Sequence, residues 1–418
     1  MSRNKKWSGL VLAAGIVAGA WIAPARSAVE DGFRQIALLV DILQTIREQY
    51  VDDVEQKTVV YGAAAGMARV LDPFSQFMEP AALKEMRTET QGQFGGLGIR
   101  IAVRDNWLTV ITPMPDTPAY RLGVLPGDKI IQIENTSTQG MGVEDAVNLL
   151  RGKPGTKVTV HIAREGDKEP RVFTITREII KIQSVRSVLV EPAIGYIRLS
   201  EFIETSAADL GKALKELKAK GMRSLVLDLR NNPGGLLSSA VDVSKLFLAD
   251  GKLIVYTQGR VQPRQDFLAD SRAPFGDVPL AVLVNGGSAS ASEIVTGAVQ
   301  DHRRGVIIGS ETFGKGSVQS VIPLEDGSAL RLTVAKYYTP AGRSIHRDEK
   351  TKAGGVTPDI VIAVSKETEA KLYAQADEIY SKDKAPRSVV KDEDRVKDEV
   401  LERAVQILKA EAVFHAGK

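Results

Sequence analysis

The sequence predicts an α/β protein whose core is a largely parallel sheet, with a smaller α+β domain inserted before the core and helical arms at both ends. Two runs rich in apolar residues, Ser224–Arg230 and Leu280–Val284, are typical of strands covered on both faces. Each run is followed by a glycine-containing turn and then by apolar residues at helical spacing. Sites in open α/β sheets form at the carboxyl ends of strands, so both turns belong at one edge of the sheet.

The first 28 residues have the parts of an export signal. Lys5 and Lys6 precede an uncharged apolar run, Ser8–Ala23, and an Ala-x-Ala cleavage pattern occupies residues 23–25. The run is short for a membrane span, which needs about 20 residues. We therefore expect residues 1–28 to direct the chain to the bacterial periplasm. Cleavage is the favoured outcome, but tryptophans bracket the run, so an uncleaved anchor in the inner membrane stays an alternative.

Composition excludes several classes of site. The 418-residue chain has no cysteine, which rules out a thiol nucleophile, thiolate zinc sites and disulfides. Its formal net charge is +3, and removal of the four basic residues of the export segment changes this to −1. No basic patch predicts a nucleic-acid partner.

The remaining chain divides into four regions. Residues 29–90 read as a helical arm for packing or dimerisation. One helix of this arm is predicted at Thr58–Leu71 and ends before Asp72-Pro73. Residues 366–418 are charged and helix-prone, with a mixed-charge linker at residues 383–397, and we expect a solvated helix or a dimer arm there. Between these arms lie residues 91–180 and residues 181–365.

The sequence pattern of residues 91–180 predicts short strands and two helices. The strands are Ile99–Val103, Leu108–Thr112, Lys129–Glu134, Lys157–Ala163 and Val172–Thr176, and the helices are Pro118–Leu122 and Val143–Leu150.

Two segments of that region, Thr117–Val124 and Pro126–Ile131, resemble the PDZ domain family. The resemblance implies a groove between a strand and the longer helix, in which a peptide adds as an extra strand. The carboxylate-binding loop would be Gly96, Leu97, Gly98 and Ile99. The alternative is a glycine-rich hairpin without a ligand.

Residues 181–365 form the predicted core. Further strands are expected at Gly195–Leu199 and Leu330–Tyr338, and further helices after Ser206 and at Leu236–Leu248.

The serine-rich stretch Ser288–Glu293 follows the strand Leu280–Val284 and the turn glycines Gly286 and Gly287. A serine at a strand-to-helix turn exposes its hydroxyl beside the positive end of a helix, which suits a nucleophile and the oxyanion that it generates. On local pattern alone, a helix cap is the stronger interpretation of this stretch.

A serine nucleophile needs a base. Among the histidines, His302 reads as a helix-end cation, whereas His346 stays a candidate. Lys315 lies between two glycines, where it can reach the sheet edge and lose water, and burial can lower a lysine pKa by several units. Gln319, one helical turn further on, is placed to orient the amine. Taken alone, Lys315 fits a phosphate-binding or surface lysine equally well.

Four motifs in this order resemble the carboxyl-terminal processing (tail-specific) peptidases, which are serine proteases. The motifs are Ser288–Ile294, Thr312–Gln319, Asp228–Gly235 and Gly355–Asp359.

The resemblance implies a ClpP/crotonase-like core and an endopeptidase with Ser290 as nucleophile, Lys315 as general base and Gln319 as the residue that orients the lysine. Ser288 and Ser292 are the rival nucleophiles, and the family pattern, in which the nucleophile stands three residues before a glutamate, selects Ser290.

The oxyanion donors would be the backbone N–H of Ala291 and that of Gly235 or Gly234, with Gly235 preferred. No cofactor and no metal is implied. The expected partners are unfolded or tail-bearing protein substrates, a second copy of the chain in a homodimer or higher homo-oligomer, and an adaptor protein as a further candidate.

Two alternatives come from other classes. In a non-catalytic envelope scaffold the PDZ domain would bind tails while the core served as support. A crotonase-type acyl-CoA enzyme would share the core fold, but an export signal argues against intracellular CoA chemistry.

Overall fold

The computed structural model describes residues 33–114, 116–270, 272–348, 350–375 and 395–415. The predicted export segment and most of the predicted linker at residues 383–397 lie outside the described residues. Within them, no helix is both long and apolar enough to cross a membrane. The chain divides into two compact units, one of residues 1–79 with 321–332, and one of the remainder.

The first unit contains a helix over residues 33–49, the helix α2 (Gln56–Arg69) and the strand β1 (Gln76–Met78). β1 pairs antiparallel with residues 329–331 at the start of β18 (Ala329–Tyr338). Tyr61 on α2 donates a hydrogen bond of 2.7 Å to Asp326. The predicted helix Thr58–Leu71 is thus confirmed, two residues earlier at each end.

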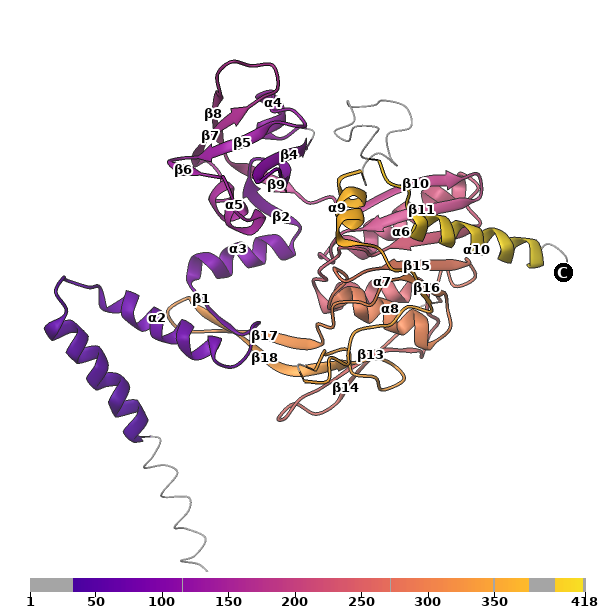
Figure 1. The fold of residues 1–418 in the computed structure, drawn as a ribbon. Helices are drawn as coiled ribbons and strands as arrows, with labels where there is room; N and C mark the ends of the chain where they lie inside the picture. Colours follow the sequence, from indigo (N-terminus) through magenta and orange to yellow (C-terminus); the bar gives the residue numbers. More distant parts are fainter. Residues whose placement is uncertain (1–32, 115, 271, 349, 376–394, 416–418) are drawn as a thin grey trace, which may run out of the picture. The chain divides into compact units, whose positions relative to one another are not determined.

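The inserted domain is a sheet with strand order β3-β4-β5-β7-β8, and β6 pairs with β5 (Figure 1). Its elements are β3 (Ile99–Arg104), β4 (Trp107–Pro113), α4 (Pro118–Arg121), β5 (Lys129–Ile133), β6 (Thr136–Ser137), α5 (Val143–Leu150), β7 (Lys157–Ala163) and β8 (Arg171–Thr176). All predicted strands and both helices are present, because alternating apolar residues of each element enter one shared core.

A two-stranded ribbon closes this domain. The ribbon pairs β2 (Gln93–Gly96) with β9 (Glu178–Lys181) antiparallel, so the two ends of the inserted segment lie side by side. A helix, α3 (Pro80–Thr90), precedes β2. The helix α3 lies within the predicted helical arm of residues 29–90, although no bounds were predicted for it. The ribbon was not predicted, because it joins residues more than 80 positions apart.

The core sheet has the strand order β10-β11-β12-β15-β16-β19. All neighbouring pairs are parallel except β10 with β11. The strands are β10 (Val185–Glu191), β11 (Ile194–Leu199), β12 (Ser224–Asp228), β15 (Leu280–Val284), β16 (Val306–Gly309) and β19 (Ile360–Val361). A second sheet joins β13 (Leu253–Gln258), β14 (Gln265–Leu268), β17 (Ser317–Pro323) and β18.

Both faces of the core sheet are covered, as the continuous apolar runs predict. Alternate residues of β12 and β15 pack against α6 (Ser206–Ala219), α7 (Leu237–Lys245) and α8 (Ala291–Asp301). The intervening residues, such as Val226 and Leu283, pack on the other face with Val400, Ala404 and Leu408 of α10 (Glu399–His415).

The expectation of a solvated helix or dimer arm at the C-terminus is therefore wrong for α10. This helix supplies the apolar cover of one sheet face (Figure 1). Its sequence shows the apolar spacing but not the surface that the spacing fits. The shorter helix α9 (Lys366–Gln375) precedes it in the chain.

Candidate active site

The serine-rich stretch forms a sharp turn between β15 and α8. Ser290 is the residue that caps α8, and its backbone adopts φ 54° and ψ −112°. Non-glycine residues seldom take a positive φ, and such a conformation costs on the order of 1–3 kcal/mol unless its surroundings hold it. A strained serine at a strand-to-helix turn has the geometry of a nucleophile elbow, which exposes the hydroxyl at the sheet edge.

The three serines of this stretch have different surroundings. The hydroxyl of Ser288 donates to the Leu229 carbonyl at 2.8 Å, and that of Ser292 donates to the Asn232 carbonyl at 2.9 Å. Both residues are fully buried, whereas Ser290 is only half-buried. Ser288 and Ser292 therefore bind the loop after β12 to the elbow, and Ser290 is the one of these three serines that is partly exposed.

Lys315 lies in the loop between β16 and β17, and this loop packs against the elbow. The N–H of Phe313 donates to the Ser288 carbonyl at 3.0 Å. Arg347 braces the loop from the other side, because its guanidinium donates to the carbonyls of Thr312 and Phe313. Gly316 must be glycine, since a Cβ there would collide with the backbone of His346. Lys315 itself is half-buried.

The Glu293 carboxylate joins the elbow to this loop. Its Oε2 accepts the N–H of Ser290 at 2.8 Å and the N–H of Lys315 at 2.9 Å. Its Oε1 accepts the Thr312 hydroxyl at 2.6 Å and the Gly314 N–H at 2.7 Å. Burial raises the pKa of the Glu293 carboxyl, and these four hydrogen bonds oppose that shift. The signal for Glu293 in the sequence is its position three residues after Ser290.

The loop after β12 forms the second side of the site. The Asn232 carbonyl accepts the N–H of Ala289 at 3.0 Å in addition to the Ser292 hydroxyl. The Gly234 N–H donates to the Asn232 side chain at 2.9 Å. A Cβ on Gly234 would lie 2.8 Å from the Ser290 Cβ and 2.9 Å from the Ala291 nitrogen. Gly234 thus lies directly against the elbow.

The predicted peptide-binding loop Gly96–Ile99 connects β2 to β3 in the inserted domain. Gly98 has φ 74°, and a Cβ there would collide with Thr117. The Leu97 carbonyl accepts the Ala119 N–H at 3.0 Å, which holds the loop against α4. β3 is an edge strand of its sheet and α5 packs beside it, so one side of β3 is open to an added strand.

Comparisons with known proteins identify the family of the chain. The model of peptidase family S41 matches residues 193–362, and a PDZ domain model matches residues 109–164. A carboxy-terminal-processing protease of Bartonella bacilliformis is 44% identical over 341 residues, which are 80% of this chain and 76% of that relative. The chain belongs to peptidase family S41.

Other relatives of this S41 peptidase have the same kind of name. A carboxyl-terminal-processing protease of Synechocystis is 36% identical over 343 residues, 80% of this chain and 78% of the relative. The solved photosystem II D1 C-terminal processing protease is 32% identical, with a TM-score of 0.50, and the match covers 78% of this chain and 92% of that one. The predicted resemblance is confirmed, and the S41 peptidase is a serine peptidase with a PDZ domain rather than an acyl-CoA enzyme.

The structure of this S41 peptidase also gives the positions of three other residues named in the sequence analysis. Gln319 lies in β17, so it is four residues from Lys315 along an extended segment, and the expected helical turn between them is wrong. His302 follows the last residue of α8, at the end of the helix opposite to the serine turn. Its ring nitrogen contacts the Leu253 carbonyl at 2.7 Å. His346 lies beside Gly316, next to Lys315 in sequence.

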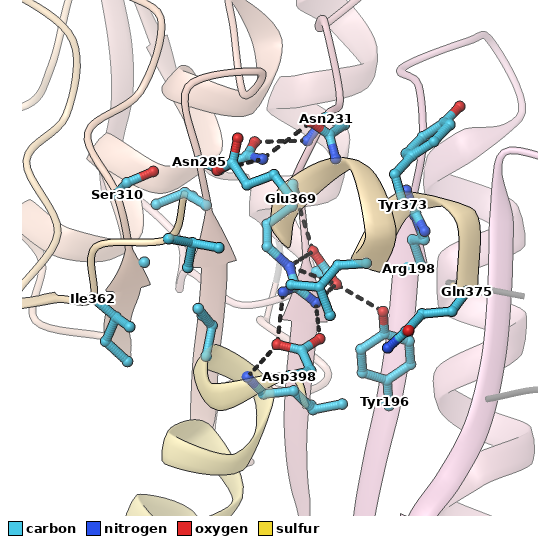
Figure 2. Close-up of a pocket in the computed structure, with 18 residues that line it drawn as sticks. Tyr196, Arg198, Asn231, Asn285, Ser310, Ile362, Glu369, Tyr373, Gln375 and Asp398 are labelled. Carbon is cyan, nitrogen blue, oxygen red and sulfur yellow. Dashed lines mark hydrogen bonds and ion pairs between the residues drawn. The ribbon is translucent and has the colours of Figure 1, made fainter. Parts of the chain in front are cut away.

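A cavity of about 200 Å³ lies behind the site, between the strand ends and α9 (Figure 2). Asn231 and Asn285, which hold the two turns together through side-chain hydrogen bonds, lie at one side of it. Arg230 binds both Asp228 and Asp398, which precedes α10, at 2.6 and 2.8 Å. Ser290 and Lys315 are not among the residues that line this cavity. Among the described residues, no group of His, Asp or Glu side chains is arranged to hold a metal ion.

Proposed function

We propose that this S41 peptidase is an exported endopeptidase that binds protein C-terminal tails through its PDZ domain and cleaves them with Ser290 and Lys315, assisted by Gln319. The observation that carries the proposal is the difference among the three serines. Ser288 and Ser292 are buried and bound to carbonyls, while Ser290 is partly exposed on a strained turn whose backbone shares one carboxylate with Lys315.

The proposed reaction proceeds through an acyl-enzyme. The Ser290 oxygen bonds to the scissile carbonyl carbon while its proton passes to the neutral Lys315 amine, and the carbonyl electron pair moves to oxygen. Collapse of this intermediate breaks the peptide bond, and the leaving amine takes the proton from Lys315. Water then attacks the ester with Lys315 as base, and the Ser290 oxygen leaves with the returned proton.

The oxyanion would be held by the backbone N–H groups of Ala291 and Gly235. Ala291 is the first residue of α8, where N–H groups are free of intrahelical bonds and the helix dipole favours negative charge. Gly235 is preferred to Gly234 because the Gly234 N–H already donates to Asn232. One such donor contributes about 3–4 kcal/mol to the barrier reduction.

Substrate capture is proposed to occur at the edge of β3. A tail would add as a strand between β3 and α5, and its carboxylate would meet the backbone of Gly96, Leu97, Gly98 and Ile99. Glycines in this loop let N–H groups converge on an anion.

Cleavage of an unfolded protein with an apolar C-terminus tests the catalytic assignment. Ser290→Ala and Lys315→Ala should each abolish cleavage. Lys315→Arg should also fail, because arginine does not release its proton near neutral pH. Lys218→Ala, on the exposed face of α6, is the matched control and should be fully active. Retained cleavage in either dyad variant refutes the dyad, and loss in His346→Gln with retention in Lys315→Ala would make the histidine the base.

Export and assembly are proposed from the N-terminal region. Residues 1–28 would carry the chain to the periplasm, and the mass of the mature protein in envelope fractions distinguishes cleavage from anchoring. The helix over residues 33–49 leaves large apolar side chains exposed, including Phe33, Ile36 and Leu39. We propose that this arm contacts a second copy, and removal of residues 29–50 should lower the mass measured by light scattering.

A further inference from the structure

We propose that Glu293 is a positioning residue that holds the nucleophile turn and the lysine loop in one fixed arrangement. The inference rests on the proposed function, since it concerns how Ser290 and Lys315 come to face the same substrate. Glu293 itself does not contact the substrate in this proposal; it acts only through the backbone of the two catalytic residues.

Shared acceptance by one oxygen is the first support. The N–H groups of Ser290 and Lys315 lie 2.8 and 2.9 Å from the same Oε2 atom, so the two nitrogens are no farther apart than the sum of those distances. The two residues belong to different elements, the start of α8 and the loop after β16. A movement of either backbone away from the other must therefore break a charge-assisted hydrogen bond.

Strain at Ser290 is the second support. Its φ of 54° is unfavourable for a residue with a side chain. Such a conformation persists when surrounding contacts over-determine it. The Glu293 bond to the Ser290 N–H is one of these contacts, and the Glu293 backbone N–H donates to the Ser290 carbonyl at 2.9 Å as well.

The complete satisfaction of the carboxylate is the third support. A buried carboxylate accepts about four hydrogen bonds when ionised, and here all four come from donors at 2.6–2.9 Å. An amide at this position would turn one oxygen into a donor that faces two other donors. A shorter carboxylate would withdraw from the Ser290 and Lys315 N–H groups. Only a glutamate of this length satisfies the site.

The test compares Glu293→Gln with Thr312→Val. Glu293→Gln should lower kcat at least about 100-fold, the usual effect of a misplacement of about 1 Å at a reacting group, with KM within about threefold. Labelling of Ser290 by a serine-reactive probe should slow by a similar factor. Thr312→Val removes a donor from Oε1 but leaves both Oε2 bonds in place, so the losses of kcat and of labelling rate should be at least about tenfold smaller than in Glu293→Gln, and thermal stability should fall.

Three outcomes decide the proposal. A folded Glu293→Gln enzyme with unchanged kcat and labelling overturns it, as does an equal kcat loss in Thr312→Val. If Glu293→Gln does not fold, Glu293→Asp is measured in the same assays, and wild-type kcat in that variant overturns the proposal too. Failure of the dyad itself is recognised separately, because Ser290→Ala and Lys315→Ala would then still cleave.

Discussion

Substitution of Gly234 by alanine should lower kcat strongly, although it replaces neither residue of the proposed dyad. Gly234 has φ 104°, a region that residues with a Cβ rarely adopt. The new Cβ would lie 2.7 Å from the Ala289 carbonyl oxygen and 2.8 Å from the Ser290 Cβ. Because ordinary contacts begin at 3.4 Å, the loop must retreat by about 0.7 Å from the Ala289 carbonyl oxygen and by about 0.6 Å from the Ser290 Cβ.

The substitution has two energetic effects. The left-handed backbone costs about 1–2 kcal/mol in stability. The retreat also carries the adjacent Gly235 N–H away from the proposed position of the oxyanion, and loss of one oxyanion donor costs about 10²–10³ in kcat. We therefore expect a kcat reduction of about 100-fold or more, with a modest loss of stability.

The assay measures kcat and KM on a tail-bearing protein, with urea unfolding for stability. Gly251→Ala is the matched control, because Gly251 also has a positive φ of 77° but open space around its Cβ position. The control should lose stability and keep its kcat. A folded Gly234→Ala enzyme with kcat within about threefold of the wild type would refute the placement of this loop at the oxyanion.

Three further predictions concern other parts of the chain. Arg230→Met should destabilise the protein by about 3–5 kcal/mol in urea unfolding, because it leaves Asp228 and Asp398 without their shared cation, and retention of full stability would contradict the role of this network in docking α10. Burial alone would raise the pKa of Asp228, but the charge and hydrogen bonds of Arg230 outweigh burial and hold that pKa below its usual range. The stability that ionised Asp228 contributes is therefore present above pH ~4, and it is lost as the pH falls through the lower pKa of the folded state. Acid unfolding of Asp228→Asn should accordingly be less steep in that range than that of the wild type, and an identical pH dependence would show that other groups dominate. Gly98→Ala should raise KM for tail-bearing proteins, because the new Cβ collides with Thr117, whereas cleavage of a short peptide that bypasses the groove should change little. Equal effects on both substrates would show that this loop does not bind the tail.

Much of the fold was predictable because the elements are locally encoded. β15 and α5 begin and end at the predicted residues, and β7 does as well. Their apolar periodicity is a local property of the chain. The β2–β9 ribbon and the role of α10 were not predictable in this way. Each depends on a partner far away in sequence, and a helical stripe shows that a surface is buried but not against which face.

The candidate site was likewise predictable from the sequence only in part. The local pattern leaves Ser288, Ser290 and Ser292 as rivals, and the resemblance to the family selects Ser290. In the structure, burial and hydrogen bonds also distinguish the three serines. The helical turn assumed between Lys315 and Gln319 failed because β17 is extended through its pairing with β18.

The sequence by itself determined the family and the order of the two domains, and it named the residues that are proposed for the site. These follow from short-range patterns and from motifs that need no knowledge of distance. Only the tertiary structure decided which of the three serines is partly exposed, which glycine N–H is already bound, and that Glu293 joins two loops. The physical reason is that hydrogen-bond satisfaction and burial belong to pairs of residues, and the members of these pairs are brought together only when β12, β15 and β16 align their carboxyl ends in one sheet.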